Sequence, residues 1–183
     1  MRKLIVSLLV IVLPVLLIKS SLAHYTLTES GKFKGANLHP YYYESTIPST
    51  WKSYIDASFG EWNSKSSKVF LYASSSTVDS RISMGGGFSE IAVTVVYGGL
   101  KGEPHEFFRI TFNEDRKFST IGSNDYNLRT VARHEIGHAL GLDHVGGIFP
   151  SSDTKAHIMY ENYTGEKGLH AHDIEGLREI YGN

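Results

Sequence analysis

The stretch HEIGHALGLDH, His134 to His144, sets three histidines, one glutamate and one glycine at fixed offsets. On a helix, residues four apart lie on one face, so His134 and His138 project together and can bind one ion. Gly141 can adopt a positive φ, which would end the helix and bring His144 round as a third ligand. Three neutral imidazoles leave one tetrahedral position for water, which is typical of a catalytic zinc site.

Glu135 directly follows the first histidine, where its carboxylate can reach a metal-bound water without being a ligand. The pattern therefore predicts one catalytic Zn²⁺ on His134, His138 and His144, with Glu135 as the general base. The competing interpretation is a set of surface histidines on an amphipathic helix. Chance would place five specified residues at these offsets in only about one such sequence in ten thousand.

The helix that carries this motif also has an apolar side. Its hydrophobic residues recur every four positions, at Leu128, Ala132, Ile136 and Leu140. At 100° per residue the two helical histidines lie about 200° and 240° round the helix from Ala132, so one side of the helix can pack in the core while the opposite side binds metal. Three upstream residues are candidate N-caps, namely Asn124, Asp125 and Asn127.

Strands and two further helices are predicted around this motif. Stretches rich in β-formers predict five strands, which begin near Leu38, Lys68, Ser80, Glu90 and Phe107. A helix that starts at Pro48, Ser49 and Thr50 is expected to bury the stripe Trp51, Ile55, Phe59 and Trp62, and a closing helix the stripe Ile174, Leu177, Ile180 and Tyr181. Strands before and between helices predict an α+β fold, an α/β sandwich, in which the sequence does not order the strands.

The N-terminus has the layout of a secretory signal peptide. MRKLIVSLLVIVLPVLLIKSSLA combines a basic start, a mostly apolar run and small residues placed for cleavage before His24. We therefore expect a signal peptide over residues 1–23 and a single domain over residues 24–183, since 183 residues with 41% hydrophobic content suit one core. An uncleaved membrane anchor is the alternative, but the apolar run falls short of the ~18 to 20 residues that a span requires.

Charge and cysteine content exclude several classes of function. Cleavage before His24 would leave 15 basic against 19 acidic residues, a balance that argues against nucleic acid as a partner. The absence of cysteine excludes disulfides and cysteine-based catalysis.

The motif resembles the HExxHxxGxxH signature of the metzincin metalloproteases, and Met159 in HIMY resembles their Met-turn. Among metzincins, the matrixin catalytic domain is most similar. VARHEIGHALGLDH, HIMY and HDIEGLREIYG each resemble matrixin segments, and FGEWNS resembles the end of the family's first helix. The likeness is specific from Tyr126 to Gly182 and loose from Leu38 to Asn113. Astacins fit less well, because they have a tyrosine at the position of Glu161.

This resemblance implies a twisted mixed sheet of about five strands with three helices, and zinc in a cleft between an upper and a lower part. It implies a secreted, extracellular zinc endopeptidase that cleaves polypeptides, with no membrane association after signal cleavage, and we expect a monomer. Met159, Gly141 and Asp173 would support the site. The strand EIAVTVVY is expected to border the cleft, although an interior position stays open. The alternative function is a non-catalytic exported zinc-binding protein of metzincin fold that binds a protein partner.

The sequence also departs from the matrixin pattern. The spacing of the family's structural zinc is missing, and His39 and His105 are expected to be surface histidines. Ca²⁺ at residues 113–115 is possible but lacks a clear motif, and a polar turn is favoured there. His172 stands where matrixins usually have an aspartate, which leaves Asp173 to hold the last helix against the Met-turn or simply to favour its dipole. Residues 145–156 are longer than in compact matrixins, and the cysteine of matrixin latency is missing.

Overall fold

The structure is a computed structural model that describes residues 26–27, 32–35, 37–98, 103–122, 124–146 and 150–182. The predicted signal peptide over residues 1–23 lies outside this range. Within it, every helix is too short or too polar to cross a bilayer.

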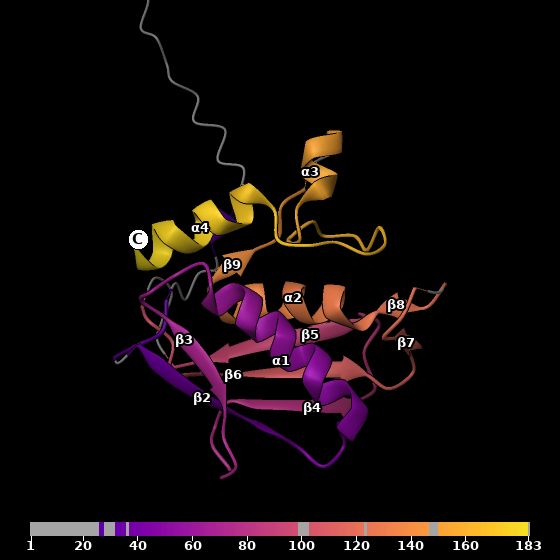
Figure 1. The fold of residues 1–183 in the computed structure, drawn as a ribbon, viewed down its shortest axis with the longest axis horizontal. Helices are drawn as coiled ribbons and strands as arrows, with labels where there is room; N and C mark the ends of the chain where they lie inside the picture. The colour runs from indigo at the N-terminus through magenta and orange to yellow at the C-terminus, as the bar shows by residue number, and fades with distance from the viewer. Residues whose placement is uncertain are drawn as a thin grey trace, which may run out of the picture.

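A mixed five-stranded sheet occupies the lower part of Figure 1, in the order β3-β2-β4-β6-β5. Its strands are β2 (Leu38–Tyr43), β3 (Phe70–Ala73), β4 (Arg81–Gly85), β5 (Ala92–Tyr97) and β6 (Phe107–Asn113). The five predicted strand regions are thus all present. Four strands run parallel, and only β5 is antiparallel to its neighbour β6. Because β5 ends the sheet, EIAVTVVY takes the edge position that was expected for it.

Two helices pack against each other and against this sheet. They are α1 (Ser49–Asn63) and α2 (Leu128–Ala139). Along the α1 stripe, Ile55, Phe59 and Trp62 are buried, as the predicted periodicity requires. The whole α2 stripe is buried as well, so both helices turn their apolar sides to one core.

The ends of α2 follow from local chemistry. Of the three candidate caps, Asn127 is the one used, because its side chain accepts a hydrogen bond from the backbone N–H of Thr130. Gly141 has a φ of 95°, which favours glycine and turns the chain after the last helical turn. The short strand β9 (Leu142–Asp143) follows at once and pairs with β1 (Thr26–Leu27), while β7 (Phe118–Ser119) pairs with β8 (Tyr126–Asn127) before the helix.

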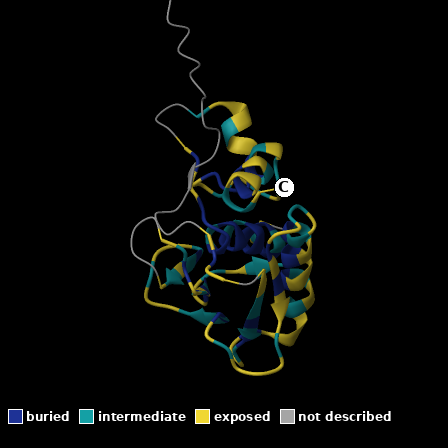
Figure 2. Cartoon of the chain, turned by 90° about the vertical axis from the view of Figure 1, so that its left-hand side faces the viewer, coloured by how far each residue is buried: buried dark blue, intermediate teal, exposed yellow. Residues whose placement is uncertain are grey.

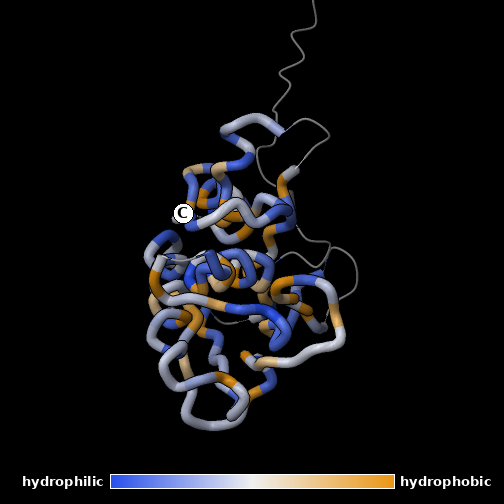
Figure 3. The backbone as a smooth tube through the Cα atoms, turned by 90° about the vertical axis from the view of Figure 1, so that its right-hand side faces the viewer, coloured by the Kyte–Doolittle hydropathy of each residue, from blue (hydrophilic) through white to orange (hydrophobic). Residues whose placement is uncertain are grey.

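The C-terminal segment forms a second layer above α2 in Figure 1, with α3 (Ser152–Ala156) and α4 (Ala171–Tyr181). The sequence did not predict α3, a single short helix within the stretch 145–156, which is capped by the side chain of Ser151. Buried residues concentrate in the middle of the molecule, between the sheet and this upper layer (Figure 2). Hydrophobic and hydrophilic residues alternate along the tube in Figure 3, as expected when every element contributes one face to a shared core.

The expected surface position of His105 is wrong. Its side chain is fully buried, and its Nε2 lies 2.9 Å from the carbonyl oxygen of Ala139. The ring of Phe33 packs between His105 and His39, with centroids 4.1 and 4.2 Å away. His105 is therefore a hydrogen-bonded core residue that ties the strand region before β6 to the end of α2.

Candidate active site

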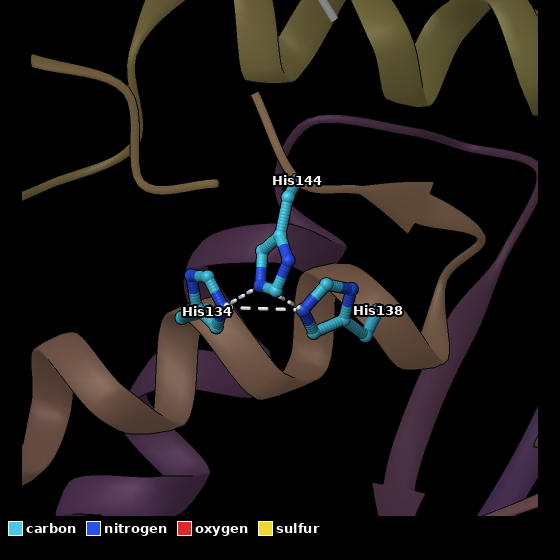
Figure 4. A group of neighbouring side chains, drawn as sticks. All are labelled: His134, His138 and His144. Carbon is cyan, nitrogen blue, oxygen red and sulfur yellow. Dashed lines mark hydrogen bonds between the residues drawn. The ribbon is translucent and has the colours of Figure 1, made fainter. Parts of the chain in front are cut away.

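Three histidine rings converge at the front of α2 (Figure 4). His134 and His138 come from successive turns of the helix, and His144 comes from the chain that returns after Gly141. Their three Nε2 atoms stand 3.1 Å from one another. The structure thus brings together the three predicted ligands in the arrangement that the motif implied.

The protonation of these rings leaves lone pairs facing each other. His134 Nδ1 lies 2.8 Å from the carbonyl oxygen of Ile158, and His138 Nδ1 lies 2.9 Å from that of Leu142. A carbonyl oxygen only accepts, so each Nδ1 carries the proton and, in a neutral ring, each Nε2 carries a lone pair. Two lone pairs 3.1 Å apart repel unless a cation lies between them. The donor set therefore fits a zinc ion, and the two carbonyls orient the rings for it.

Burial keeps the two helical histidines neutral. Loss of hydration lowers the pKa of His134 to about 4 and that of His138 to about 4, because it disfavours the charged ring. Their neighbouring histidines act in the same direction. Neutral imidazole is the form that binds metal, so the site is prepared for an ion over the whole neutral pH range.

Glu135 lies beside the triad and points toward β5 rather than joining the ligands. Its carboxylate Oε2 accepts a hydrogen bond of 2.7 Å from the hydroxyl of Thr94, which also lies 3.0 Å from the Glu135 backbone oxygen. Burial raises the pKa of Glu135, and the hydrogen bond from Thr94 partly opposes that rise. A carboxyl group tuned in this way can both take and return a proton.

A cleft of about 570 Å³ opens in front of these groups. β5 and α2 line one part of it, and most of the segment of residues 158–167 lines another. The three histidines and Glu135 all line it, so the candidate ligands and the candidate base face the same space as the edge strand.

The turn that carries Met159 packs against α2. Met159 is buried, and its Sδ occupies the place where a side chain on Gly137 would lie. The Val145 N–H donates to the carbonyl oxygen of Met159 at 2.8 Å, which ties this turn to the residue after His144. Met159 therefore contacts the chain next to His144, and its support of the site stays a prediction.

Asp173 holds the Met-turn from the other side. Its fully buried carboxylate accepts from the backbone N–H groups of Ile158 at 2.9 Å, Met159 at 3.4 Å and His170 at 2.8 Å. Two roles were predicted for Asp173, a contact with the Met-turn and a favourable interaction with the helix dipole. The structure contains the contact, and the residue also lies in the first turn of α4. Because the Ile158 carbonyl in turn contacts His134, α4 is connected to the candidate ligands through two hydrogen bonds.

Helix α2 is fixed to α1 by an ion pair. Arg133 Nε lies 2.7 Å from Oε2 of Glu61, and its Nη2 lies 2.8 Å from Oε1. Arg129 reaches the same carboxylate, and Trp62 Nε1 donates to the Arg133 carbonyl oxygen at 2.9 Å. A bidentate pair with little exposure at Arg133 fixes the rotation of α2, and so the direction of its histidines.

Gly137→Ala is expected to destabilise the protein although alanine favours helices. Helix propensity alone would stabilise by about 1 kcal/mol, but the new Cβ would overlap Met159 Sδ and lie 3.3 Å from Cζ2 of Trp62. Overpacking of this kind costs about 1–3 kcal/mol, so the melting temperature should fall. Gly60→Ala in α1 is the matched control, since nothing lies within 4 Å of its added Cβ, and it should raise the melting temperature. Equal shifts for both variants would contradict the tight contact.

Sequence reasoning missed the partners that complete the site. The hydroxyl of Thr94 and the carbonyls of Ile158 and Leu142 gave no signal in the sequence, because any residue supplies a carbonyl and one threonine in a strand is common.

The structure also brings His157, His170 and His172 into a second cluster. His39 and His105 lie outside both histidine clusters of the described residues, and the side-chain amide of Asn113 donates to the backbone oxygens of Phe88 and Glu90.

Comparison with known proteins agrees with this geometry. The family described as Matrixin matches residues 37–182. Interstitial collagenase of Sus scrofa is 43% identical over 86 residues, which cover 46% of this chain and 15% of the collagenase. Matrix metalloproteinase-20 of Homo sapiens is 31% identical over 137 residues, which cover 72% of this chain and 26% of that protein. Matrix metalloproteinase-19 of Homo sapiens is 29% identical over 143 residues, which cover 75% of this chain and 27% of that protein.

The mixed sheet, the histidine-bearing helix with its glycine turn and the underlying methionine define a metzincin-type fold. More narrowly, the chain belongs to the matrixin family, whose match covers most of its length. Its matched region spans between 15% and 27% of the lengths of these three relatives. Matrixins are zinc-dependent, in agreement with the three converging ring nitrogens.

Proposed function

We propose that this protein is an exported zinc-dependent endopeptidase that cleaves extracellular polypeptides. The observation that carries the proposal is the cleft in which three converging histidines, a buried glutamate and an edge strand meet. Each component has a separate role in peptide hydrolysis, and the alternative of a non-catalytic binding protein leaves the tuned carboxyl group of Glu135 without a use.

His134, His138 and His144 would hold the ion. Zinc held there would supply a water of lowered pKa and a Lewis acid for the scissile carbonyl. Glu135 would take a proton from the attacking water and pass it to the departing amine. The hydroxyl of Thr94 would hold the carboxylate of Glu135 in position during both transfers.

The substrate would lie along β5. This strand pairs with β6 on one side and ends the sheet on the other, so its outer edge can hydrogen-bond an extended peptide as an added strand. β5 also lines the cleft with the histidines, which would place a scissile bond near them. A complex with a substrate analogue that shows no backbone contacts to residues 91–97 would contradict this arrangement.

Export would rest on residues 1–23 acting as a cleaved signal peptide, with residues 24–183 as the mature, monomeric domain and no membrane association. N-terminal sequencing of the exported protein should give a chain that starts at His24. A chain that keeps its first 23 residues at the membrane would support the tethered alternative and leave the chemistry unchanged.

The experiment that tests the activity combines metal analysis with an unbiased peptide library. Residues 24–183 should cleave library peptides, and a chelator should abolish the cleavage until zinc is restored. The cleaved positions would define the specificity. If the zinc-loaded protein cleaves nothing in the library or in unfolded protein substrates, the binding function is favoured over the protease.

Thr94→Val is expected to move the acid limb of the pH profile of kcat/KM to higher pH. The Thr94 bond lowers the pKa of Glu135 against the effect of burial, so its loss raises that pKa further and the base form appears only at higher pH. Thr111→Val is the matched control, because Thr111 contacts Ser83 on the neighbouring strand rather than Glu135. An unchanged acid limb in Thr94→Val would show that the ionisation of Glu135 does not determine the pH dependence of kcat/KM.

A further inference from the structure

A second histidine cluster lies in the upper layer, outside the residues that line the cleft. His157 follows α3, whereas His170 caps α4 and His172 lies in its first turn. The ring centroids are 4.5, 5.2 and 5.2 Å apart, close to the 4.7, 4.7 and 5.1 Å of the triad on α2. The candidate ligand nitrogens of all three rings lie within 4.8 Å of one another.

Asp153 of α3 completes this cluster with a carboxylate. Its Oδ1 lies 3.5 Å from His170 Nε2, and its Oδ2 lies 3.8 Å from both His157 Nε2 and His172 Nδ1. His172 Nδ1 and His157 Nε2 are 3.3 Å apart. Ligands about 2.0 Å from a tetrahedral ion stand about 3.3 Å from one another, so these four groups need only small shifts to share one metal.

The surroundings of His157 favour a cation. Its ring is 1% exposed, and its Nδ1 has no hydrogen bond among the described residues, although Asp173 Oδ1 lies 3.7 Å away. A ligand histidine with its second N–H turned to a carboxylate is the usual outer-shell arrangement of a zinc site. Glu175 adds a third carboxylate, 3.9 Å from His172 Nε2, while Lys167 Nζ bonds to the His157 carbonyl oxygen at 3.3 Å.

We propose that His157, His170, His172 and Asp153 bind a second zinc ion. Three imidazoles and one carboxylate suit a first-row transition metal rather than Ca²⁺ or Mg²⁺, which take oxygen ligands. Four protein ligands close a tetrahedral site, so this ion would be structural, in contrast to the open triad on α2.

Metal binding would change one existing contact. His170 Nδ1 accepts a hydrogen bond of 3.4 Å from the His172 N–H, which places the proton of the neutral ring on Nε2. Ligation through Nε2 moves that proton to Nδ1 and gives up this long bond. The N-terminus of α4 keeps its stronger contact, because Asp173 still accepts from the His170 N–H at 2.8 Å.

The position of the site gives the ion a structural consequence. His157 immediately precedes residues 158–169, and His170 immediately follows them. Most of this segment, including Tyr160 and Tyr163, lines one wall of the cleft. An ion on both ends would close the segment into a loop and reduce its freedom, so the metal would stiffen that wall without touching substrate.

The test is a zinc titration of the metal-stripped protein against a chromophoric chelator, with Co²⁺ absorbance as a second reading. The wild type should bind two ions, and His172→Ala and Asp153→Asn should weaken one site by more than about 100-fold, since loss of an outer-shell partner alone costs 10–100-fold. These two side chains are partly exposed, so the variants should fold. Glu175→Gln is the matched control and should still bind two ions.

His138→Ala separates this proposal from the proposed protease. That variant should lose the ion on α2 and keep one ion, whose binding should slow hydrogen exchange of residues 158–169. His138→Ala combined with His172→Ala should bind none. Zinc stoichiometry and affinity in His172→Ala equal to those of the wild type would overturn the second site, and so would a wild type whose single ion disappears in His138→Ala. A single ion lost in His172→Ala but retained in His138→Ala would instead overturn the site on α2.

Discussion

Glu135→Gln is expected to lower peptide hydrolysis by roughly 10²–10⁴-fold while leaving the zinc content unchanged. The amide keeps the size of the side chain and can still accept from Thr94, but it cannot take a proton from water. The ligands on α2 do not depend on this carboxylate, because their second nitrogens bond to the carbonyls of Ile158 and Leu142. Steady-state kinetics and metal analysis of the same sample provide the two measurements.

A thermal scan without zinc gives an independent reading of the same variant. Burial raises the pKa of Glu135 above its usual value, so the ionised carboxylate costs stability at every pH above the unfolded value of 4.5. Replacement by a neutral amide should therefore raise the melting temperature of the metal-free protein at pH 7. Wild-type turnover would show that another group is the base, whereas a lower melting temperature would show that the ionised form is stabilised by its surroundings.

The part of the site that the sequence predicted is the part encoded by short-range geometry. His134 and His138 are one helical turn apart, and Gly141 needs only a positive φ to bring His144 back. The stripes of α1 and α2 follow from the same periodicity, because each helix has to bury one side. These features depend on offsets of three to ten residues, which a sequence displays directly.

The rest depends on contacts between distant segments. The Thr94 hydroxyl meets Glu135 across 41 positions, and Arg133 meets Glu61 across 72. The order of the strands and the burial of His105 likewise follow from packing, which no local pattern encodes. His105 was expected at the surface because histidine usually is exposed, but the carbonyl of Ala139 satisfies its ring nitrogen in the core.

The second histidine cluster had one signal in the sequence. The resemblance to matrixins led us to expect an aspartate at the position of His172, and His170 stands two residues before it. His172 can be interpreted as a metal ligand only from the fold, because α3 and the residue after it bring Asp153 and His157 to the start of α4. Because α3 packs against residues that lie well after it in the chain, no local pattern predicts its position.

Asp173 connects the two histidine clusters. Its carboxylate faces His157 Nδ1 on one side and accepts from the N–H of Ile158 on the other, and the carbonyl of Ile158 orients His134. A change at this buried group should therefore affect both the stability of the upper layer and the affinity of the ligands on α2.

Asp173→Asn is expected to reduce the free energy of unfolding by about 3 kcal/mol, because hydrogen bonds to a charged acceptor contribute about 1.5–3 kcal/mol each and the amide nitrogen cannot accept. For a domain of this size the melting temperature should fall by roughly 10 °C. Zinc affinity of the site on α2 should also fall, since the Ile158 peptide loses its anchor.

Denaturant unfolding and a zinc titration of Asp173→Asn measure these two effects. Glu175→Gln is the matched control on the same helix, because its carboxylate is exposed and its replacement should change stability by less than about 0.5 kcal/mol. Comparable stability of the two variants would mean that the buried carboxylate contributes no more than a surface charge. A large loss of stability with unchanged zinc affinity would instead confine Asp173 to the packing of α4, so that His134 keeps its orientation without the anchor at Ile158.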